Sequence, residues 1–314
     1  MFNNLPAVRT STSEPDFDSL PAYTVAAKQA DTDAQAILCG AMIWAAFAAP
    51  GAIPQTFDCI CRAQLGLPVS PRALVIQSTS LGEEFWLRFE EILVGPKAGY
   101  DATLITVAVA SLNAALDPSF AELSEAAAIL HSGADNAQTK PVPAMILLSD
   151  LAEQPEGSLA RELLAMWVEN GFDPEVLDRE AIGLGQLSPA LHYLNTRILQ
   201  MHDIWHLVGG YQTTSLHEMA ISAFQLAQFG HNYSAQFLAT VGTMSYLHQP
   251  QGFSLLLQNM AEAWVHGCDA PHFMNIEWEQ DWHLSKDEVR QKYGIKPFAG
   301  SFPPDLLEQL SQGS

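Results

Sequence analysis

The chain has 314 residues, of which 48% are hydrophobic and 16% charged, so it can bury a sizeable core within one domain. Its 14 basic and 35 acidic residues give a formal net charge of -21, which argues against nucleic-acid binding and against a broad basic face for anionic membranes. The four cysteines, Cys39, Cys59, Cys61 and Cys268, form neither a disulfide framework nor a zinc-type Cys-x-x-Cys pair, so we expect a reduced, intracellular protein.

The N-terminal residues set the first predicted boundary. Residues 1–18 are polar and interrupted by prolines, which predicts a mobile tail followed by a single all-helical domain over residues 19–314. The same stretch lacks the apolar core of a secretory signal, and Glu14, Asp16 and Asp18 are not typical of a mitochondrial presequence. We therefore expect a bacterial, cytoplasmic protein that contacts the inner membrane face at most peripherally.

The uncharged run Ala34–Phe57 raises the question of a membrane span. Pro50 should end its helix, and a helix of about 16 residues is roughly 24 Å long, shorter than the roughly 30 Å hydrocarbon core of a bilayer. We interpret the segment as a buried helix. The apolar run Thr103–Leu116 is also too short to span a bilayer, and Asp117-Pro118 ends it.

Most of the remaining chain shows apolar residues at helical spacing, with Gly or Pro near the segment ends. The clearest segments are residues 83–93, 120–130, 158–169 and 253–265. The basic residues of a further predicted helix, interpreted as a solvated face, are Lys286, Arg290, Lys292 and Lys296. Strand-like alternation is nearly absent, although Leu74–Ile76 and Ile146–Leu148 fit either a helix end or a strand. The prediction is an all-α fold.

A metal-ligating pattern lies on one more predicted helix, which begins at Ser188-Pro189 and ends at Gly209-Gly210. His202, Asp203 and His206 stand at positions i, i+1 and i+4, within an arc of roughly 100° on one side of that helix. Imidazole and carboxylate groups together suit a divalent ion. The spacing therefore predicts that this face of the helix binds a metal.

Glu218 can supply a fourth ligand from a second helix, predicted to begin at Ser215 after a short turn. Ser215-x-x-Glu218 also has the spacing of a capping box, in which the carboxylate only binds an amide of its own helix. Asp203 has two interpretations as well, as a direct ligand or as an acceptor that orients an imidazole N–H. A zinc protease would need Glu where the chain has Asp203, and only His217 and His231 remain as candidate bases for a hydrolase.

The four predicted ligands, His202, Asp203, His206 and Glu218, follow the pattern His-Asp-x-x-His, eleven residues, Glu. This pattern resembles the signature of the coenzyme Q (ubiquinone) biosynthesis proteins of the Coq-four type. Arg197, five residues before the first His, also fits that family. Further similar stretches are Pro155–Leu159, Asn170–Pro174, Glu277–Trp282 and Val289–Ile295, so the resemblance covers residues 148–296.

The resemblance implies metal-dependent oxidative decarboxylation of a polyprenylated 4-hydroxybenzoate, in which hydroxyl replaces the carboxylate at ring carbon one. It implies that His202, Asp203, His206 and Glu218 act through the metal and that Arg197 is a further catalytic residue. Zinc is the ion usually given to the family, but zinc has no redox chemistry, and two His with a carboxylate also suit non-haem iron. The implied partners are a polyprenylated aromatic acid or quinone-like lipid and other ubiquinone biosynthesis proteins.

A long isoprenoid chain needs an apolar cavity beside the metal site. Candidates for its lining, or simply for the core, are Phe224, Leu226, Phe229, Phe237, Leu238, Val241 and Met244. The alternative function is a non-catalytic scaffold that binds prenyl lipids and organises a biosynthetic complex, and a homodimer is compatible with either function. Vacant metal positions favour the enzyme, whereas a closed four-ligand site favours the scaffold.

Overall fold

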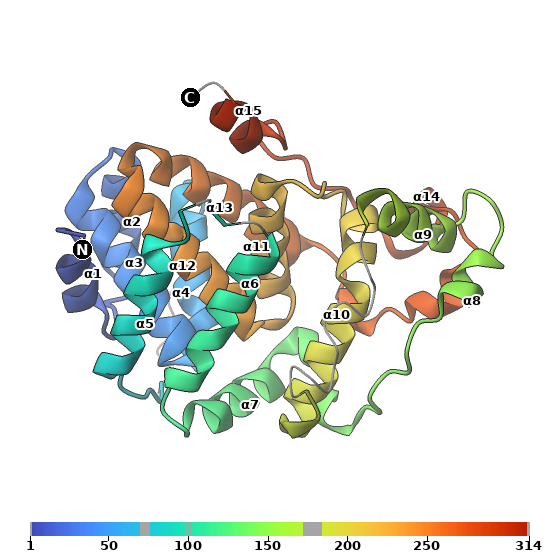
Figure 1. Cartoon of the computed structure of the whole chain (residues 1–314), viewed down its shortest axis with the longest axis horizontal. Helices are drawn as coiled ribbons and strands as arrows, with labels where there is room; N and C mark the ends of the chain where they lie inside the picture. The colour runs from blue at the N-terminus through green and yellow to red at the C-terminus, as the bar shows by residue number, and fades with distance from the viewer. Residues whose placement is uncertain (1, 70–75, 98, 101, 172–183, 313–314) are drawn as a thin grey trace.

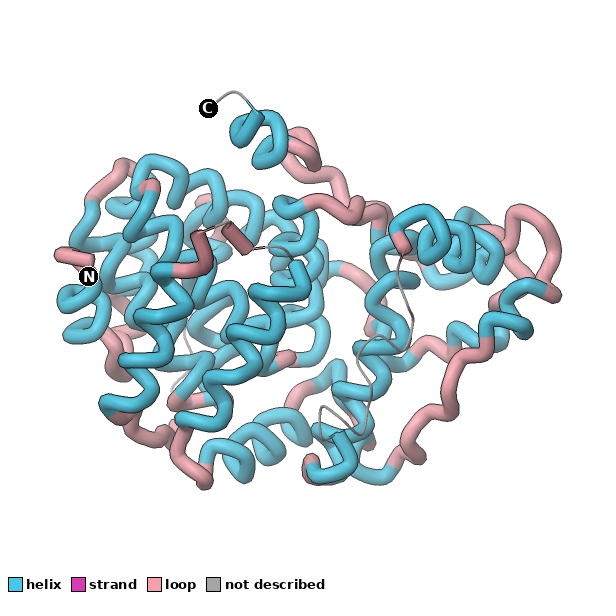
Figure 2. The backbone as a smooth tube through the Cα atoms, in the orientation of Figure 1, coloured by secondary structure: helices cyan, strands magenta, loops and turns pink. Residues whose placement is uncertain are grey.

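A computed structural model of the chain describes residues 2–69, 76–97, 99–100, 102–171 and 184–312. Every regular element in these residues is helical and none is a strand, which confirms the all-α prediction (Figure 2). The α-helices are α1 (Leu5–Ser11), α2 (Leu20–Lys28), α3 (Thr32–Phe47), α4 (Ile53–Gln64), α5 (Glu83–Val94), α6 (Ala102–Ser111), α7 (Phe120–Leu130), α8 (Leu148–Ala152), α9 (Leu159–Asn170), α10 (Pro189–Gly209), α11 (Ser215–Phe229), α12 (Asn232–His248), α13 (Phe253–Asp269), α14 (Lys286–Tyr293) and α15 (Leu306–Gln312).

Two of the short segments noted in the sequence fall partly outside the described residues. These are Leu74 and Val75, and residues 172–174 of the run that begins at Asn170. The other ambiguous run is not a strand, because Ile146 lies in irregular chain and Leu148 begins α8.

Helix α3 forms the centre of the N-terminal half of the molecule. Asp31 caps its first turn by accepting hydrogen bonds from the amides of Asp33 and Ala34, and nearly every later residue is buried. Helices α1, α2 and α12 pack against it (Figure 1). The uncharged segment is therefore a buried core helix, as its length and Pro50 predicted.

The predicted mobile tail is wrong, because residues 5–11 form helix α1. Leu5 and Val8, three residues apart, are buried on α3. The two helices are in close contact at Gly40, where a Cβ would lie 2.5 Å from the carbonyl oxygen of Ser11. Two apolar side chains on one face, with Pro6 in the first turn, are enough to order this polar segment once a tertiary surface receives it.

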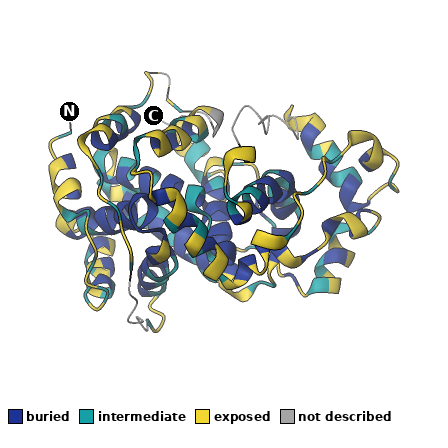
Figure 3. Ribbon diagram, turned by 90° about the horizontal axis from the view of Figure 1, so that it is seen from below, coloured by how far each residue is buried: buried dark blue, intermediate teal, exposed yellow. Residues whose placement is uncertain are grey.

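Helix α10 lies between the N-terminal helices and the end formed by α8, α9 and α14 (Figure 1). It contacts α7, α9 and α14, while α11 packs along α13 and α13 packs on α4. Figure 3 shows buried residues toward the inside of the molecule and exposed residues on the outer turns of its helices. The consecutive helices α10 and α11 thus belong to a packed frame that can fix side chains between them.

The length and composition of the described helices bear on whether one of them could cross a bilayer. No single helix among them is both long and apolar enough to cross a bilayer. The segments Leu104–Ala115 and Phe120–Leu130 together have the length and apolar composition of a membrane span, but the chain bends by 115° between them.

Candidate metal centre

The helix that carries the predicted ligands is held at its N-terminus by a carboxylate from α7. Ser188 is the N-cap and Pro189 occupies the first turn, as predicted. Glu125 accepts hydrogen bonds from the Ser188 hydroxyl (2.6 Å) and from the amides of Ala190 (2.9 Å) and Leu191 (3.0 Å). The negative charge satisfies amides that have no partner within the helix and complements the positive end of the helix dipole.

A cation from α14 holds the other end of α10. Arg290 donates from Nε to the carbonyl of Val208 (3.0 Å) and from Nη2 to that of Leu207 (2.9 Å). Gly210 follows with φ +80°, and a Cβ there would lie 2.7 Å from Cβ of Pro297. Arg290 is thus not part of a solvated basic face but satisfies the free carbonyl groups that end the helix.

The start of α11 decides what Glu218 does. Thr214 is the N-cap, and the amide of Ser215 donates to Oε1 of Glu308 in α15 at 2.8 Å. The capping-box interpretation of Ser215 and Glu218 is therefore wrong, because Glu308 occupies the position that Glu218 would take. Glu218 is left to face α10.

Three side chains converge between the two helices. Nε2 of His202 and Nε2 of His206 lie 3.0 Å apart. Glu218 approaches both rings, with Oε2 at 3.5 Å from His202 Nε2 and Oε1 at 3.4 Å from His206 Nε2. The side chain of His206 is only 1% exposed, whereas those of His202 and Glu218 are 30% and 33% exposed, so the cluster is open on one side.

These separations fit the donor atoms of a single metal ion. Ligands at about 2.0–2.1 Å in a tetrahedron lie roughly 3.3 Å from one another. His206 Nδ1 lies 3.3 Å from the carbonyl oxygen of Tyr211, which can only accept, so the ring proton is on Nδ1 and the lone pair of Nε2 faces His202 and Glu218. The donor chemistry and spacing suit a divalent cation held by two imidazoles and one carboxylate.

The electrostatics of the cluster favour positive charge. Burial opposes protonation of His202, but its hydrogen bond with Glu218 and the negative charges of Glu218 and Asp203 raise the pKa of His202. Burial would raise the pKa of Glu218, but hydrogen bonds with His202 and His206 and their charge lower it well below its usual range. A proton and a metal ion would therefore compete for the same place.

Asp203 lies beside the cluster and has a partner of its own. Its Oδ2 accepts a hydrogen bond from Nε1 of Trp167 in α9 at 2.5 Å. Ligand atoms of His202, Asp203 and His206 nevertheless all lie within 4.8 Å of one another. The Trp167 bond fixes a negative charge near the predicted ligands, and both interpretations of Asp203 stay predictions.

Arg197 is buried and held by the segment before α14. Its guanidinium forms a bidentate ion pair with Glu279 and donates to the carbonyl of Ile276 at 3.2 Å. Five residues along a helix correspond to a rotation of about 140°, so Arg197 and His202 do not share a face of α10. The bonds of Arg197 link α10 to the C-terminal segment, and we interpret it as a positioning residue.

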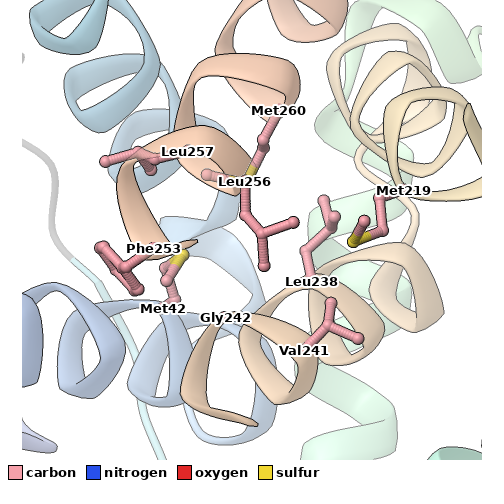
Figure 4. A pocket seen from close by; sticks show the side chains of 9 residues that line it. All are labelled: Met42, Met219, Leu238, Val241, Gly242, Phe253, Leu256, Leu257 and Met260. Atoms are coloured by element: carbon pink, nitrogen blue, oxygen red, sulfur yellow. The ribbon is translucent and has the colours of Figure 1, made fainter. Parts of the chain in front are cut away.

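A small apolar hollow opens beside α11. Figure 4 shows its side chains, which come from α3, α11, α12 and α13. They are Met42, Met219, Leu238, Val241, Gly242, Phe253, Leu256, Leu257 and Met260. Of the seven predicted lining residues only Leu238 and Val241 line this hollow, whereas Phe224, Leu226 and Phe229 are buried in the core.

Comparison with protein families identifies the chain. The model of the family "Coenzyme Q (ubiquinone) biosynthesis protein Coq4" matches residues 112–299, more than half of the 314 residues. The chain belongs to the Coq4 family. All four predicted ligands and Arg197 lie within the matched residues, which begin earlier than the resemblance in the sequence suggested.

Curated Coq4 proteins are similar over part of their length. The chain is 29% identical over 165 residues to "Ubiquinone biosynthesis protein COQ4 homolog, mitochondrial" of Rattus norvegicus, covering 52% of this chain but only 58% of the rat protein. It is 26% identical over 234 residues to the Trypanosoma brucei brucei protein of the same name, covering 66% and 90% of the two chains. The names of both relatives place those proteins in mitochondria.

The fold also occurs in a solved structure. A crystal structure of a Nostoc punctiforme protein assigned to ubiquinone biosynthesis superposes with a TM-score of 0.52 at 24% identity. It covers 69% of this chain and 100% of its own. At this identity the comparison supports the fold alone. Helices α1–α6 and α15, including Glu308, lie outside the residues that match the Coq4 family.

Proposed function

We propose that this Coq4 protein catalyses metal-dependent oxidative decarboxylation of a polyprenylated 4-hydroxybenzoate in ubiquinone biosynthesis. The bond between ring carbon one and the carboxylate breaks to release carbon dioxide, and a carbon–oxygen bond forms at the same carbon. The ring loses two electrons to dioxygen, which leaves as hydrogen peroxide, and water supplies the oxygen of the new hydroxyl. The observation that carries the proposal is the convergence of His202, His206 and Glu218 at the separations of ligands on one ion.

The roles of the residues follow from their contacts. His202, His206 and Glu218 would hold the metal, and a bound divalent ion supplies Lewis acidity that stabilises negative charge on a substrate carboxylate or phenolate. The partial exposure of His202 and Glu218 leaves an approach for the substrate. Asp203, fixed by Trp167, would orient the ligands or add a weaker one. Zinc and iron both suit this ligand set.

The proposed substrate tail would enter the apolar hollow beside α11, whose free volume of about 20 Å³ would have to widen to admit it. Glu218 faces the imidazoles, and the next residue along α11, Met219, lines the hollow. Its lining is apolar throughout, and three methionines give a surface that adapts to a flexible chain. We propose that a prenyl chain enters here and that contact with the membrane is peripheral. Release of the protein by salt or alkaline washes is expected, and a need for detergent would contradict the peripheral contact.

One genetic experiment tests the function. Deletion of the gene should stop ubiquinone formation and accumulate a prenylated ring acid that keeps its carboxylate. A His202→Ala protein should not restore synthesis, whereas the purified wild type with metal should convert the acid under air. If folded His202→Ala protein still binds lipid and supports normal ubiquinone levels, the enzymatic proposal fails and the non-catalytic scaffold takes its place.

A further inference from the structure

A row of hydrogen-bonded polar side chains leads away from the metal cluster through α11 and α12. It begins at Nδ1 of His202, which lies 2.6 Å from the amide of Gln225. The other atom of that amide lies 3.3 Å from Ser234 Oγ, which is 3.0 Å from His231 Nδ1. His231 Nε2 ends the row 3.3 Å from Oδ1 of Asn195, back on α10. Gln225 and Ser234 are buried, so these groups must satisfy one another.

The proton positions can be deduced from the Asn195 end. Asn195 Nδ2 donates to the carbonyl of Leu191 at 2.8 Å, which leaves Oδ1 facing His231. An amide oxygen can only accept, so His231 carries its proton on Nε2. Burial, together with the nearby charge of His202, lowers the pKa of His231 to about 3, so the ring holds a single proton and Nδ1 is an acceptor.

The number of protons available fixes the direction of the hydrogen bonds at Ser234 and Gln225. Ser234 has one hydroxyl proton, which it must give to Nδ1 of His231, so it presents only a lone pair to Gln225. The amide nitrogen of Gln225 stands 2.6 Å from His202 Nδ1, and a half-turn of the amide exchanges nitrogen and oxygen at the same two positions. Only the turned orientation gives Ser234 a donor, and it places the amide oxygen against His202.

We propose that Gln225 is a positioning residue that holds His202 in the tautomer required for metal binding, with its own orientation set by Ser234, His231 and Asn195. An oxygen at Nδ1 requires the imidazole proton there, and the Nε2 lone pair then faces His206 and Glu218. His206 reaches the same tautomer through the Tyr211 carbonyl. The proposal rests on the metal centre of the proposed function, but not on its substrate or reaction.

The test compares substitutions of similar size in the full-length chain. Gln225→Glu keeps an acceptor at Nδ1, whereas Gln225→Met removes it without removing bulk. Gln236→Met is the matched control, because Gln236 is also buried but pairs with Asn113 instead of the cluster. Zinc affinity is measured by competition with a chelating dye, and the tautomer of His202 by long-range proton–nitrogen spectra of histidine-labelled protein.

Gln225→Met should weaken zinc binding by about 10- to 100-fold, as removal of a hydrogen-bond partner of a ligating imidazole does elsewhere. Gln225→Glu should bind zinc at least as tightly as wild type. Gln236→Met should bind zinc with the same affinity as wild type. The His202 ring should carry its proton on Nδ1 in the wild type and lose this preference in Gln225→Met. Equal affinity and an unchanged tautomer in Gln225→Met would overturn the proposal.

The outcome is independent of turnover. A wild type that binds zinc and shows this order of variants, yet does not convert the prenylated acid, would overturn the proposed reaction and leave the role of Gln225 standing. Normal conversion of the prenylated acid, with no effect of Gln225→Met on zinc affinity, would overturn the role of Gln225 and leave the proposed reaction standing. A wild type that binds no metal would overturn both.

Discussion

Glu125 and Arg290 bind opposite ends of α10, and each carries the charge that its end of the helix favours. Glu125 accepts from amides of the first turn, and Arg290 donates to carbonyls of the last. Each charge stabilises the end of the helix dipole that it contacts, so both ends of α10 are held in place. The proposed ligands His202 and His206 lie between the two ends.

The first prediction concerns the hydrogen bonds between Glu125 and the start of α10. Glu125→Ala removes three hydrogen bonds to the helix start and should lower the free energy of unfolding by about 2 kcal/mol. Glu125→Gln keeps an acceptor but loses the charge, and should cost roughly half as much. Urea denaturation of the three proteins measures both effects. Equal stability of the alanine variant and wild type would show that water replaces the carboxylate without loss.

The second prediction concerns metal content. Wild-type protein should carry about one divalent ion per chain. His206→Ala and Glu218→Ala each remove one of three converging donors, so both should lose the ion during dialysis. Elemental analysis after gel filtration makes the measurement. Full occupancy in both variants would mean that the ion binds elsewhere.

The third prediction separates the two interpretations of Asp203. Asp203→Asn keeps an oxygen that can accept from Trp167 but removes the charge, so metal binding should weaken and persist. Trp167→Phe removes the hydrogen bond and keeps the charge, and should have a smaller effect. Zinc competition assays rank the two variants. Complete loss of metal in Asp203→Asn would instead identify Asp203 as a direct ligand.

The fourth prediction concerns Glu308, which lies outside the residues that match the family. In Glu308→Ala the Ser215 amide loses its acceptor, and Glu218 has the spacing to replace it. We expect weaker zinc binding in this variant, because Glu218 is drawn toward its own helix start. Glu308→Gln retains an acceptor and is the control that should bind zinc as wild type does. Identical affinities in both variants would contradict this competition.

The fifth prediction concerns pH. Burial, with a smaller effect from His272, lowers the pKa of His131 to about 4, and its Nδ1 accepts from the amide of Gly133. Between pH 6.5 and about 4 the unfolded chain binds a proton at this residue that the folded chain does not, so stability falls as the pH falls through this range. The shift from 6.5 to about 4 corresponds to a loss of up to about 3 kcal/mol.

His131→Asn removes this titration and keeps a side chain that can accept from Gly133. Its free energy of unfolding should therefore depend less steeply on pH than that of wild type over the same range, whatever its absolute stability at pH 7. Urea titrations at several pH values between 7 and 4 provide the comparison. Parallel curves for the two proteins would rule out His131 as a source of acid sensitivity.

The relative position of the proposed ligands His202 and His206 could be predicted from the sequence because it depends on local periodicity. His202 and His206 share a face of α10 through the four-residue spacing alone, and the helix ends were marked by Ser188, Pro189 and Gly210. The role of Glu218 could not be decided in the same way. A capping box and a ligand have the same local pattern, and the choice depends on Glu308, which is distant in sequence.

Other roles depend on contacts between residues that are distant in the sequence. Nothing local distinguishes Arg197 as an ion-pair partner from Arg197 as a catalytic group, because Glu279 reaches it only through the folded C-terminal segment. Likewise, α1 is a short polar helix that would be marginal alone, and α3 supplies the surface that buries Leu5 and Val8. Gln225 carries no signal at all in the sequence, since its contacts join three helices.

Glu279, Arg290 and Glu308 are synthesised after the proposed metal ligands, although their contacts hold the helices that carry those ligands. A nascent chain that has emerged only as far as α12 already contains His202, His206 and Glu218, but not the side chains that bind Arg197, the C-terminal end of α10 and the start of α11. We therefore expect the ligands to reach their final separations only after the C-terminal segment has folded back. Only the fully synthesised and folded chain would then bind the metal tightly, and truncated or stalled chains would bind it poorly.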